Sequence, residues 1–157
     1  MKYLFLLLSL LFLMGCGNQN KTASQQRILH IYNSDSLSKT YTYNLKIFRE
    51  GNLIRYSYEN EDDKSKNMVF ILNTETGTLS FAVDEFKINN PDKLYIPEIK
   101  DHMFSFYSNT NTRADLTEPI IFNQDFGVIA IGNTNAPNFI FLAEYDSKTS
   151  YFLNNGL

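Results

Sequence analysis

Only a few residues of this 157-residue sequence have the type and setting for covalent chemistry, and Cys16 is the foremost of them. It is the only cysteine, and it lies two positions after the apolar run Leu4–Met14, in which Ser9 is the only polar side chain. A thiolate is the side-chain nucleophile that reacts most readily near neutral pH. Cys16 is therefore the first candidate for covalent modification.

The segment before Cys16 has the parts of a secretory signal. Lys2 provides a basic start, and the apolar run that follows has 11 residues. As a helix, these residues rise about 16 Å, which is roughly half of the hydrocarbon core of a bilayer. The run is too short to span a membrane alone, but it has the length of a signal-peptide core. We expect residues 1–15 to form a signal-peptide helix that is cleaved from the mature protein.

The residues Leu13, Met14, Gly15 and Cys16 resemble the lipobox of bacterial lipoproteins, which has an aliphatic, a variable and a small residue before the cysteine. The resemblance implies that Cys16 receives a diacylglycerol and becomes the mature N-terminus, so that membrane lipid is a partner. Two acyl chains anchor a protein stably, at about 0.8 kcal/mol for each buried CH₂. The resemblance thus implies a bacterial cell-envelope location. Gly17, where an Asp would signal inner-membrane retention, favours the outer membrane in a diderm.

Composition limits the classes of partner and cofactor. Cleavage removes Lys2 and no acidic residue, so the formal net charge changes from −3 to −4 in the mature chain. An acidic chain without a basic cluster argues against nucleic-acid binding. With Cys16 lipidated, no thiol is left for a disulfide, a cysteine-bound zinc ion or a cysteine nucleophile. We expect a single domain with no nucleic-acid partner and no cofactor.

The histidines and the densest charged segment lack the spacing of known catalytic or metal sites. His30 and His102 belong to no H-x-x-x-H pattern. Glu59–Lys66 contains three successive acidic residues, but it lacks the spaced oxygens and the glycine of a calcium loop, so we interpret it as a solvated loop. The sequence has no G-x-S-x-G, S-x-x-K or glycine-rich phosphate motif. We therefore expect no metal site and no enzymatic activity.

The chain after Cys16 divides into a polar tether and a domain with alternating apolar residues. Gly17–Gln26 is small and polar, so residues 16–26 are interpreted as the lipidated cysteine and a flexible tether. From Ile28 onward, apolar residues recur with a period of two, which is typical of strands. The remaining residues, 27–157, are expected to form one all-β domain.

One hairpin is specified in detail by its alternation. Its inward residues are Tyr41, Tyr43, Leu45 and Ile47 on the first strand and Ile54, Tyr56 and Tyr58 on the second. A turn within Arg49–Asn52 pairs residues whose numbers sum to 101, so that Ile47 faces Ile54. All apolar residues then share one face, because a slip by one residue would move them to the other. The pattern predicts a sheet with one face in water.

The other strands are shorter and follow from similar signals. They are expected at 68–72, 79–83, 86–88, 104–106, 119–122, 126–132, 138–145 and 150–154. A change of phase at Asp84-Glu85 predicts a bulge or a strand boundary, and Pro91–Lys100 is expected to be irregular. Asn73, Asn109 and Asn133 begin similar Asn-Thr segments, which favour turns. Together these signals predict an antiparallel barrel or sandwich of about nine or ten short strands.

The tyrosines of the hairpin are the weak candidates for a ligand-binding surface. Tyr41, Tyr43, Tyr56 and Tyr58 form an aromatic stripe that could line a cavity or face a partner. Aromatic residues that alternate along strands are more often core, with their hydroxyls at the rim or hydrogen-bonded. We favour the core interpretation.

Anchoring without a catalytic motif predicts a lipid-anchored envelope protein with a non-catalytic role in binding or assembly. Two alternatives stay open. A half-open barrel could carry an acyl chain or another apolar ligand, which requires a lined cavity of several hundred Å³. An inhibitor or immunity-type protein could instead block an envelope hydrolase through a rigid polar loop, with Glu59–Lys66 and Pro91–Lys100 as the segments to inspect.

Overall fold

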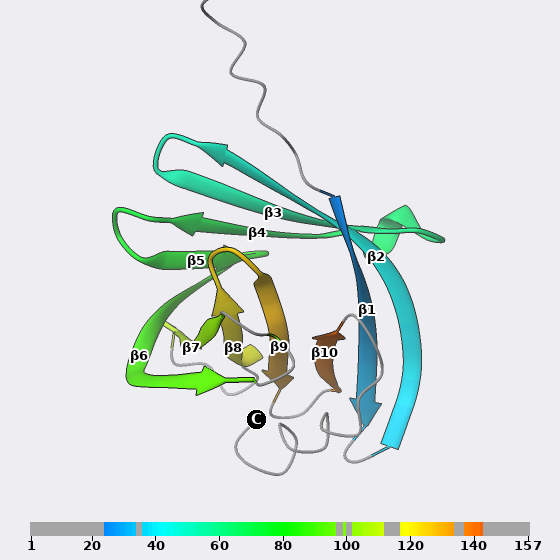
Figure 1. Ribbon diagram of the computed structural model, residues 1–157. Coiled ribbons are helices and arrows are strands. Elements are labelled where there is room, and N and C mark those ends of the chain that lie inside the picture. Colours follow the sequence, from blue (N-terminus) through cyan, green and yellow to red (C-terminus); the bar gives the residue numbers. More distant parts are fainter. Residues whose placement is uncertain are drawn as a thin grey trace, which may run out of the picture.

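The computed structural model describes residues 24–33, 36–96, 99, 102–111, 117–133 and 137–142. They form a closed antiparallel barrel in which each strand pairs with its neighbours in sequence and β10 pairs with β1 (Figure 1). The strands are β1 (Ser24–Asn33), β2 (Ser36–Glu50), β3 (Leu53–Asn60), β4 (Met68–Asn73), β5 (Thr78–Phe81), β6 (Asp84–Tyr95), β7 (Met103–Asn109), β8 (Thr117–Asn123), β9 (Gly127–Asn133) and β10 (Asn138–Leu142). The all-β prediction is confirmed, and of its two architectures the barrel is the one observed.

Two predicted boundaries are wrong. β1 begins at Ser24, so Ser24–Gln26 belong to the barrel and not to the tether. β6 extends to Tyr95 through a register shift between Ile88 and Lys93, so the segment from Pro91 onward is only partly irregular. The signal peptide, Cys16 and the strand expected at 150–154 lie outside the described residues.

The β2–β3 hairpin has the predicted faces but a different register. Glu50 pairs with Leu53 and Ile47 pairs with Tyr56, so the paired numbers sum to 103 and not to 101. The loop consists of Gly51 and Asn52, and Gly51 has a φ of +54°. A two-residue hairpin loop with positive φ at its first position favours glycine there, as in a type II′ turn. The shift by two residues leaves every side chain on its expected face.

Asparagines end many of the strands and start the turns that follow. The Oδ1 atoms of Asn73, Asn109 and Asn123 accept hydrogen bonds from the backbone N–H two residues later, at 3.0, 2.8 and 2.8 Å. Such Asx turns satisfy backbone donors where the sheet ladder stops. The turn prediction is confirmed for Asn73 and Asn109. The phase change near Asp84 is a turn at Ala82–Val83, immediately before β6.

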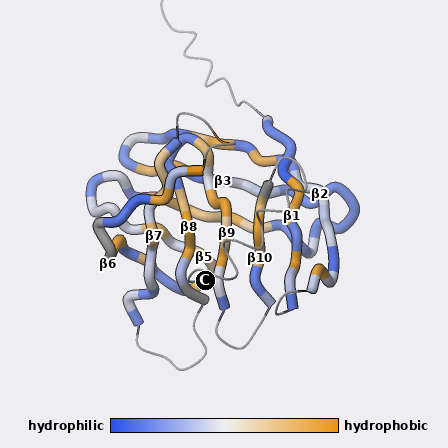
Figure 2. The backbone as a smooth tube through the Cα atoms, turned by 60° about the horizontal axis from the view of Figure 1, so that its bottom comes forward, coloured by the Kyte–Doolittle hydropathy of each residue, from blue (hydrophilic) through white to orange (hydrophobic). Residues whose placement is uncertain are grey.

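All ten strands contribute to an interior cluster, but one half of the barrel is also apolar outside. Ile121 pairs with Ala130, Ala130 with Ile140, and Ile140 with His30, so these four side chains share the outer face of β8, β9, β10 and β1. All four are at most 3% exposed. Figure 2 shows the matching apolar colouring along β8, β9 and β10. We call this layer the outer cluster; among the described residues, Tyr32, Leu94, Ile96, Ile99, Phe104, Phe106, Phe126 and Ile129 also belong to it or pack against it.

Candidate functional site

Three of the four stripe tyrosines lie in the interior cluster. Tyr43, Tyr56 and Tyr58 are at most 2% exposed, whereas Tyr41 is only partly buried. The Tyr56 hydroxyl donates to the carbonyl of Gln124 at 2.6 Å. Burial raises the pKa of the Tyr56 and Tyr58 hydroxyls, which keeps both neutral. In this structure these three side chains are core, with hydroxyls that are hydrogen-bonded as buried tyrosines require.

Aromatic rings meet across the barrel interior. Tyr56 on β3 contacts Phe122 on β8, with ring centroids 5.0 Å apart. Tyr58 contacts Phe141 on β10 at the same separation, and Tyr43 contacts Phe141 at 6.2 Å. These pairs join the inner faces of β2 and β3 to those of β8 and β10. Side chains of the protein therefore occupy this part of the interior, where a carrier would need space for a ligand.

The β8–β9 turn, residues 124–126, is bound to three other strands. Asp125 forms an ion pair with Arg49 of β2 at 2.9 Å. Arg27 of β1 places its guanidinium 4.1 Å from the ring centroid of Phe126. Gly127 follows with a φ of +93°, and a Cβ atom there would lie 2.6 Å from the Tyr58 hydroxyl oxygen. This close approach lets that hydroxyl accept from the Val128 N–H at 2.8 Å.

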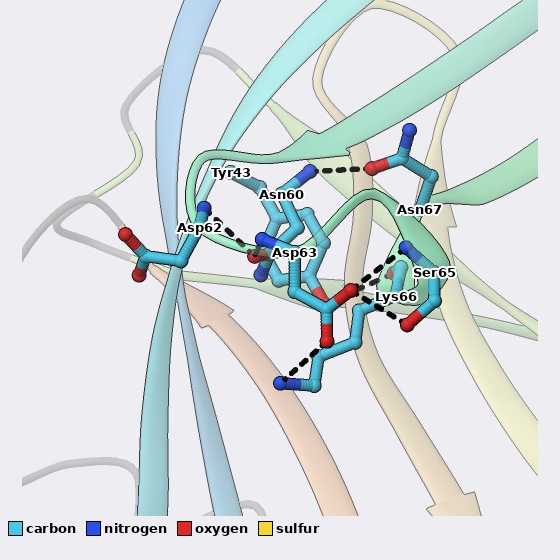
Figure 3. Close-up of polar contacts among 7 residues, drawn as sticks. All are labelled: Tyr43, Asn60, Asp62, Asp63, Ser65, Lys66 and Asn67. Carbon is cyan, nitrogen blue, oxygen red and sulfur yellow. Dashed lines mark hydrogen bonds and ion pairs between the residues drawn. The ribbon is translucent and has the colours of Figure 1, made fainter.

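The β3–β4 loop, residues 61–67, is a polar surface segment held by a network of hydrogen bonds (Figure 3). Asn60 Oδ1 accepts hydrogen bonds from the N–H groups of Asp62 and Asp63, at 3.1 and 2.8 Å. Asp63 Oδ1 accepts from the N–H and the hydroxyl of Ser65, at 2.9 and 2.6 Å. Asp63 Oδ2 also lies 3.2 Å from Lys66 Nζ. These bonds cap a short 3₁₀-helix, η2 (Lys64–Lys66), and hold the loop in one conformation.

Bonds at both ends attach the loop to the barrel. Asn67 Oδ1 accepts from the Asn60 N–H at 2.8 Å, which bridges the end of β3 and the start of β4. The Glu61 N–H donates to the Thr42 carbonyl at 3.1 Å, and Asn44 Nδ2 donates to Glu61 Oε1 at 3.1 Å. The loop is therefore anchored on β2 as well as on its own two strands.

Two tyrosines of β2, Tyr43 and Tyr41, contact this loop. The Tyr43 hydroxyl donates to the Lys66 carbonyl at 3.2 Å. Tyr41, half-buried next to it, has Lys66 Nζ 4.4 Å from its ring centroid, which is a cation–π arrangement. The aromatic stripe thus supports the loop as part of the core and does not itself form the exposed surface.

Electrostatics leave two charged side chains of the loop directed at solvent. Hydrogen bonds from Ser65, followed by the contact with Lys66, lower the pKa of Asp63, so its carboxylate is held within the loop. Asp62 is exposed, and Figure 3 shows its carboxylate pointing away from the other labelled groups. Lys64 is exposed on η2. The loop therefore carries an anion, Asp62, and a cation, Lys64, whose side chains face solvent on a backbone held by hydrogen bonds.

The acidic residues of the loop do not converge as metal ligands would. Glu61 is bound to Asn44 and Asp63 to Ser65 and Lys66. Within the described ranges, no three His, Cys, Asp or Glu side chains are grouped to hold a metal ion. The prediction of an ordinary surface loop was right about its exposure, but it missed the hydrogen-bond network. The adjacent asparagines, Asn60 and Asn67, were the signal for it.

The two histidines lie in different settings. His30 is buried on the outer face of β1, and burial lowers the pKa of its imidazole. His102 precedes β7 and is partly exposed, with its ring centroid 5.8 Å from that of Phe126. The second loop proposed for inspection, Pro91–Lys100, is partly strand, and several of its residues fall outside the described ranges. Cys16 also falls outside them.

No protein-family model, curated protein or solved structure matches the chain. The part of the chain that the structure describes contains no helix with the length and apolar character needed to cross a membrane.

Proposed function

We propose that this chain is a lipid-anchored protein of the bacterial cell envelope whose barrel has a non-catalytic role in binding or assembly. The support for anchoring is the lipobox resemblance of Leu13, Met14, Gly15 and Cys16, after a basic start and a short apolar run. With β1 beginning at Ser24, the tether shortens to residues 17–23. Seven residues reach at most about 25 Å even when fully extended, so the barrel would stay close to the membrane surface. In a diderm we place it at the outer membrane.

The observation that carries the binding role is the rigid, exposed β3–β4 loop. Its backbone is held by Asn60, Asp63 and Asn67, while Asp62 and Lys64 face solvent. A preorganised loop loses little conformational entropy when a partner binds, so each contact contributes more to affinity. The partner is another protein of the envelope, with charges complementary to Asp62 and Lys64.

The same observation favours a second candidate, an inhibitor or immunity-type protein acting on an envelope hydrolase. Such a protein needs a loop that keeps its shape when it enters an enzyme cleft, and complexes of this kind are largely preformed. The 3₁₀-helix η2 within the β3–β4 loop supplies a short, exposed and hydrogen-bonded element of that kind.

Anchoring is tested by replacing Cys16 with Ser and fractionating the cells. The wild-type chain should pellet with membranes. Cys16→Ser should move to the soluble fraction if its signal segment is removed by another route, whereas a variant that keeps residues 1–15 stays with the membrane through their apolar run, and its larger mass identifies that case. A Cys16→Ser chain that lacks residues 1–15 and still partitions with membranes as the wild type does would refute the anchor.

The loop is tested by a charge reversal, Asp62→Lys with Lys64→Glu, in the full chain. Detergent-solubilised envelope proteins are passed over the immobilised wild-type and variant chains. Proteins retained by the wild type should be lost with the variant but kept by Lys93→Glu, which changes an exposed charge beyond the register shift of β6. Retention of the same proteins by all three chains would contradict a role for the loop.

A further inference from the structure

A second exposed surface lies on the outer face of β2–β6, away from the outer cluster. Strand pairing places Phe48, Arg55, Ile71, Ser80 and Glu85 side by side in one row across these five strands. Phe48 is 39% exposed, Ile71 is half-buried, and Arg55 and Glu85 are exposed. Aromatic residues and arginine are the types enriched at the centres of protein interfaces. Phe48 and Arg55 are of these types, whereas Ser80 and Glu85 are of types that are less common at interfaces, so the Phe48–Arg55 part of the row is the candidate contact surface.

The charges of Arg55 and Glu85 are not neutralised by an ion pair with a described residue. Arg55 is flanked by Phe48 and Ile71, and Glu85 by Ser80 on the neighbouring strand. An arginine between two apolar side chains is readily desolvated by a partner that brings a carboxylate.

The two charges of the row are opposite in sign and lie three strands apart. Arg55 is on β3 and Glu85 on β6, and the two strands between them carry Ile71 and Ser80. The midpoint between Arg55 and Glu85 therefore falls between β4 and β5, about 7 Å from each residue at a strand spacing of about 4.8 Å. Consider a second copy related by a two-fold axis that is parallel to the strands, passes over this midpoint and lies in the plane between the two copies. This axis would place Arg55 of each copy opposite Glu85 of the other.

We propose that the chain self-associates through this face, with a second copy as its occupant and two reciprocal Arg55–Glu85 pairs. Such an isologous contact needs a self-complementary surface, and the row supplies one. The strands of the two copies run in line, as in aligned packing of one sheet on another. Five strands of about 20 Å span at most roughly 500 Å² on each copy, so the interface lies at or below the lower limit for a specific one. The dimer is weak, and confinement to a membrane surface strengthens it.

The proposed contact between two copies is tested in cells by cross-linking the full chain through a cysteine at Ser80, which lies next to the two-fold axis. The variant Ser80→Cys is treated with a short bismaleimide, and the envelope and soluble fractions are both examined, so loss of anchoring is separate from loss of the dimer. Ser80→Cys should form a product of twice the chain mass. The exposed turn variant Gln124→Cys and the wild type should not. Equal cross-linking of Ser80→Cys and Gln124→Cys, or a Ser80→Cys product with a different protein, would overturn self-association.

Charge reversal in the Ser80→Cys background tests the register. Arg55→Glu alone and Glu85→Arg alone should each reduce the dimeric product about tenfold, because like charges then face each other in both pairs. The double variant restores opposite charges and should recover the product. Both residues are exposed, so folding should be unaffected, and circular dichroism checks this. A double variant that cross-links no better than the single ones would refute the proposed pairing.

Discussion

The two halves of this barrel use their outer faces differently. On β2–β4, the buried side chains point inward and the outer side chains are half-buried or exposed, including the apolar Phe48 and Ile71. Arg55 is therefore exposed, while its neighbours Ile54 and Tyr56 are buried. On β8–β10 and β1, both faces are buried, as Ile120 inside and Ile121 outside show at 0% and 1% exposure. The first half is a sheet that is buried on its inner face only. The second half is buried on both faces, between the interior cluster and the outer cluster. Partner binding is therefore expected on the first half, and stability depends more on the second.

The difference between the halves predicts unequal costs for the same substitution on the outer face. Ile140→Ala in the outer cluster should reduce the free energy of unfolding by about 2–5 kcal/mol, because Ile140 is fully buried and its removal leaves a cavity. Ile71→Ala, on the outer face of β4, should cost only about 1 kcal/mol, because Ile71 is only partly buried and truncation there leaves a site open to water and not a closed cavity. Urea denaturation of both variants measures the costs. Equal values would show that the two faces are not distinct.

The contact between the halves at Gly127 predicts the next largest effect. Gly127→Ala should cost about 3 kcal/mol, because residue 127 has a positive φ and its Cβ would clash with the Tyr58 hydroxyl. Gly77→Ala is the matched control, with a φ of +67° but no atom near the new Cβ, and should cost about 1 kcal/mol. Thermal denaturation compares the two. A cost at Gly127 no larger than at Gly77 would mean that the halves are not closely joined there.

Acidification should lower the free energy of unfolding through His30, which is buried in the outer cluster. Burial lowers the pKa of His30 in the folded state, so the unfolded chain binds the proton more readily. Stability is therefore full above the unfolded pKa of about 6.5 and declines as the pH falls below it, by at most about 1.4 kcal/mol per pH unit. His30→Gln should reduce the dependence of the unfolding free energy on pH, measured in buffers from about pH 7.5 to about pH 5. If His102→Gln flattened it instead, the assignment would be wrong.

The smallest effect is expected at the β5–β6 turn of the one-sided half. Ala82 has a φ of +53°, which is unfavourable for any residue with a Cβ atom. Ala82→Gly should raise the stability by about 0.5 kcal/mol, since the relief of strain exceeds the entropy that glycine adds to the unfolded chain. Val83→Gly, in the same turn but without a positive φ, should lower it slightly. A loss of stability in both variants would contradict the strain at Ala82.

The contrast between the halves was partly visible in the sequence. Strict alternation from Tyr41 to Tyr58 predicted a sheet with one wet face, and the structure has it. The unbroken apolar run Val128–Ile131 is typical of strands buried on both sides, but a second buried layer depends on contacts between distant segments. The β2–β3 register was displaced by two residues because Gly51 takes the first position of the turn and not the second.

The position of the candidate site could be predicted from the sequence, but the hydrogen bonds that hold the loop could not. The charged segment Glu59–Lys66 was identified as an exposed loop between two strands, but only its residues from Glu61 onward form the loop, because Glu59 and the buried Asn60 belong to β3. Its rigidity depends on Asn60 and on bonds to Thr42 and Tyr43 of β2, which the fold brings near the loop. Such bonds join residues far apart in sequence, and periodicity carries no information about them.

The most direct test of the proposed lipid-anchored barrel is the mass of its mature N-terminus. Mass spectrometry of the membrane-extracted chain should find a protein that begins at Cys16, with the added mass of a diacylglyceryl group and, in many bacteria, a third acyl chain. The Cys16→Ser chain should lack this addition. A wild-type chain that retains residues 1–15, or that carries an unmodified Cys16, would contradict the account.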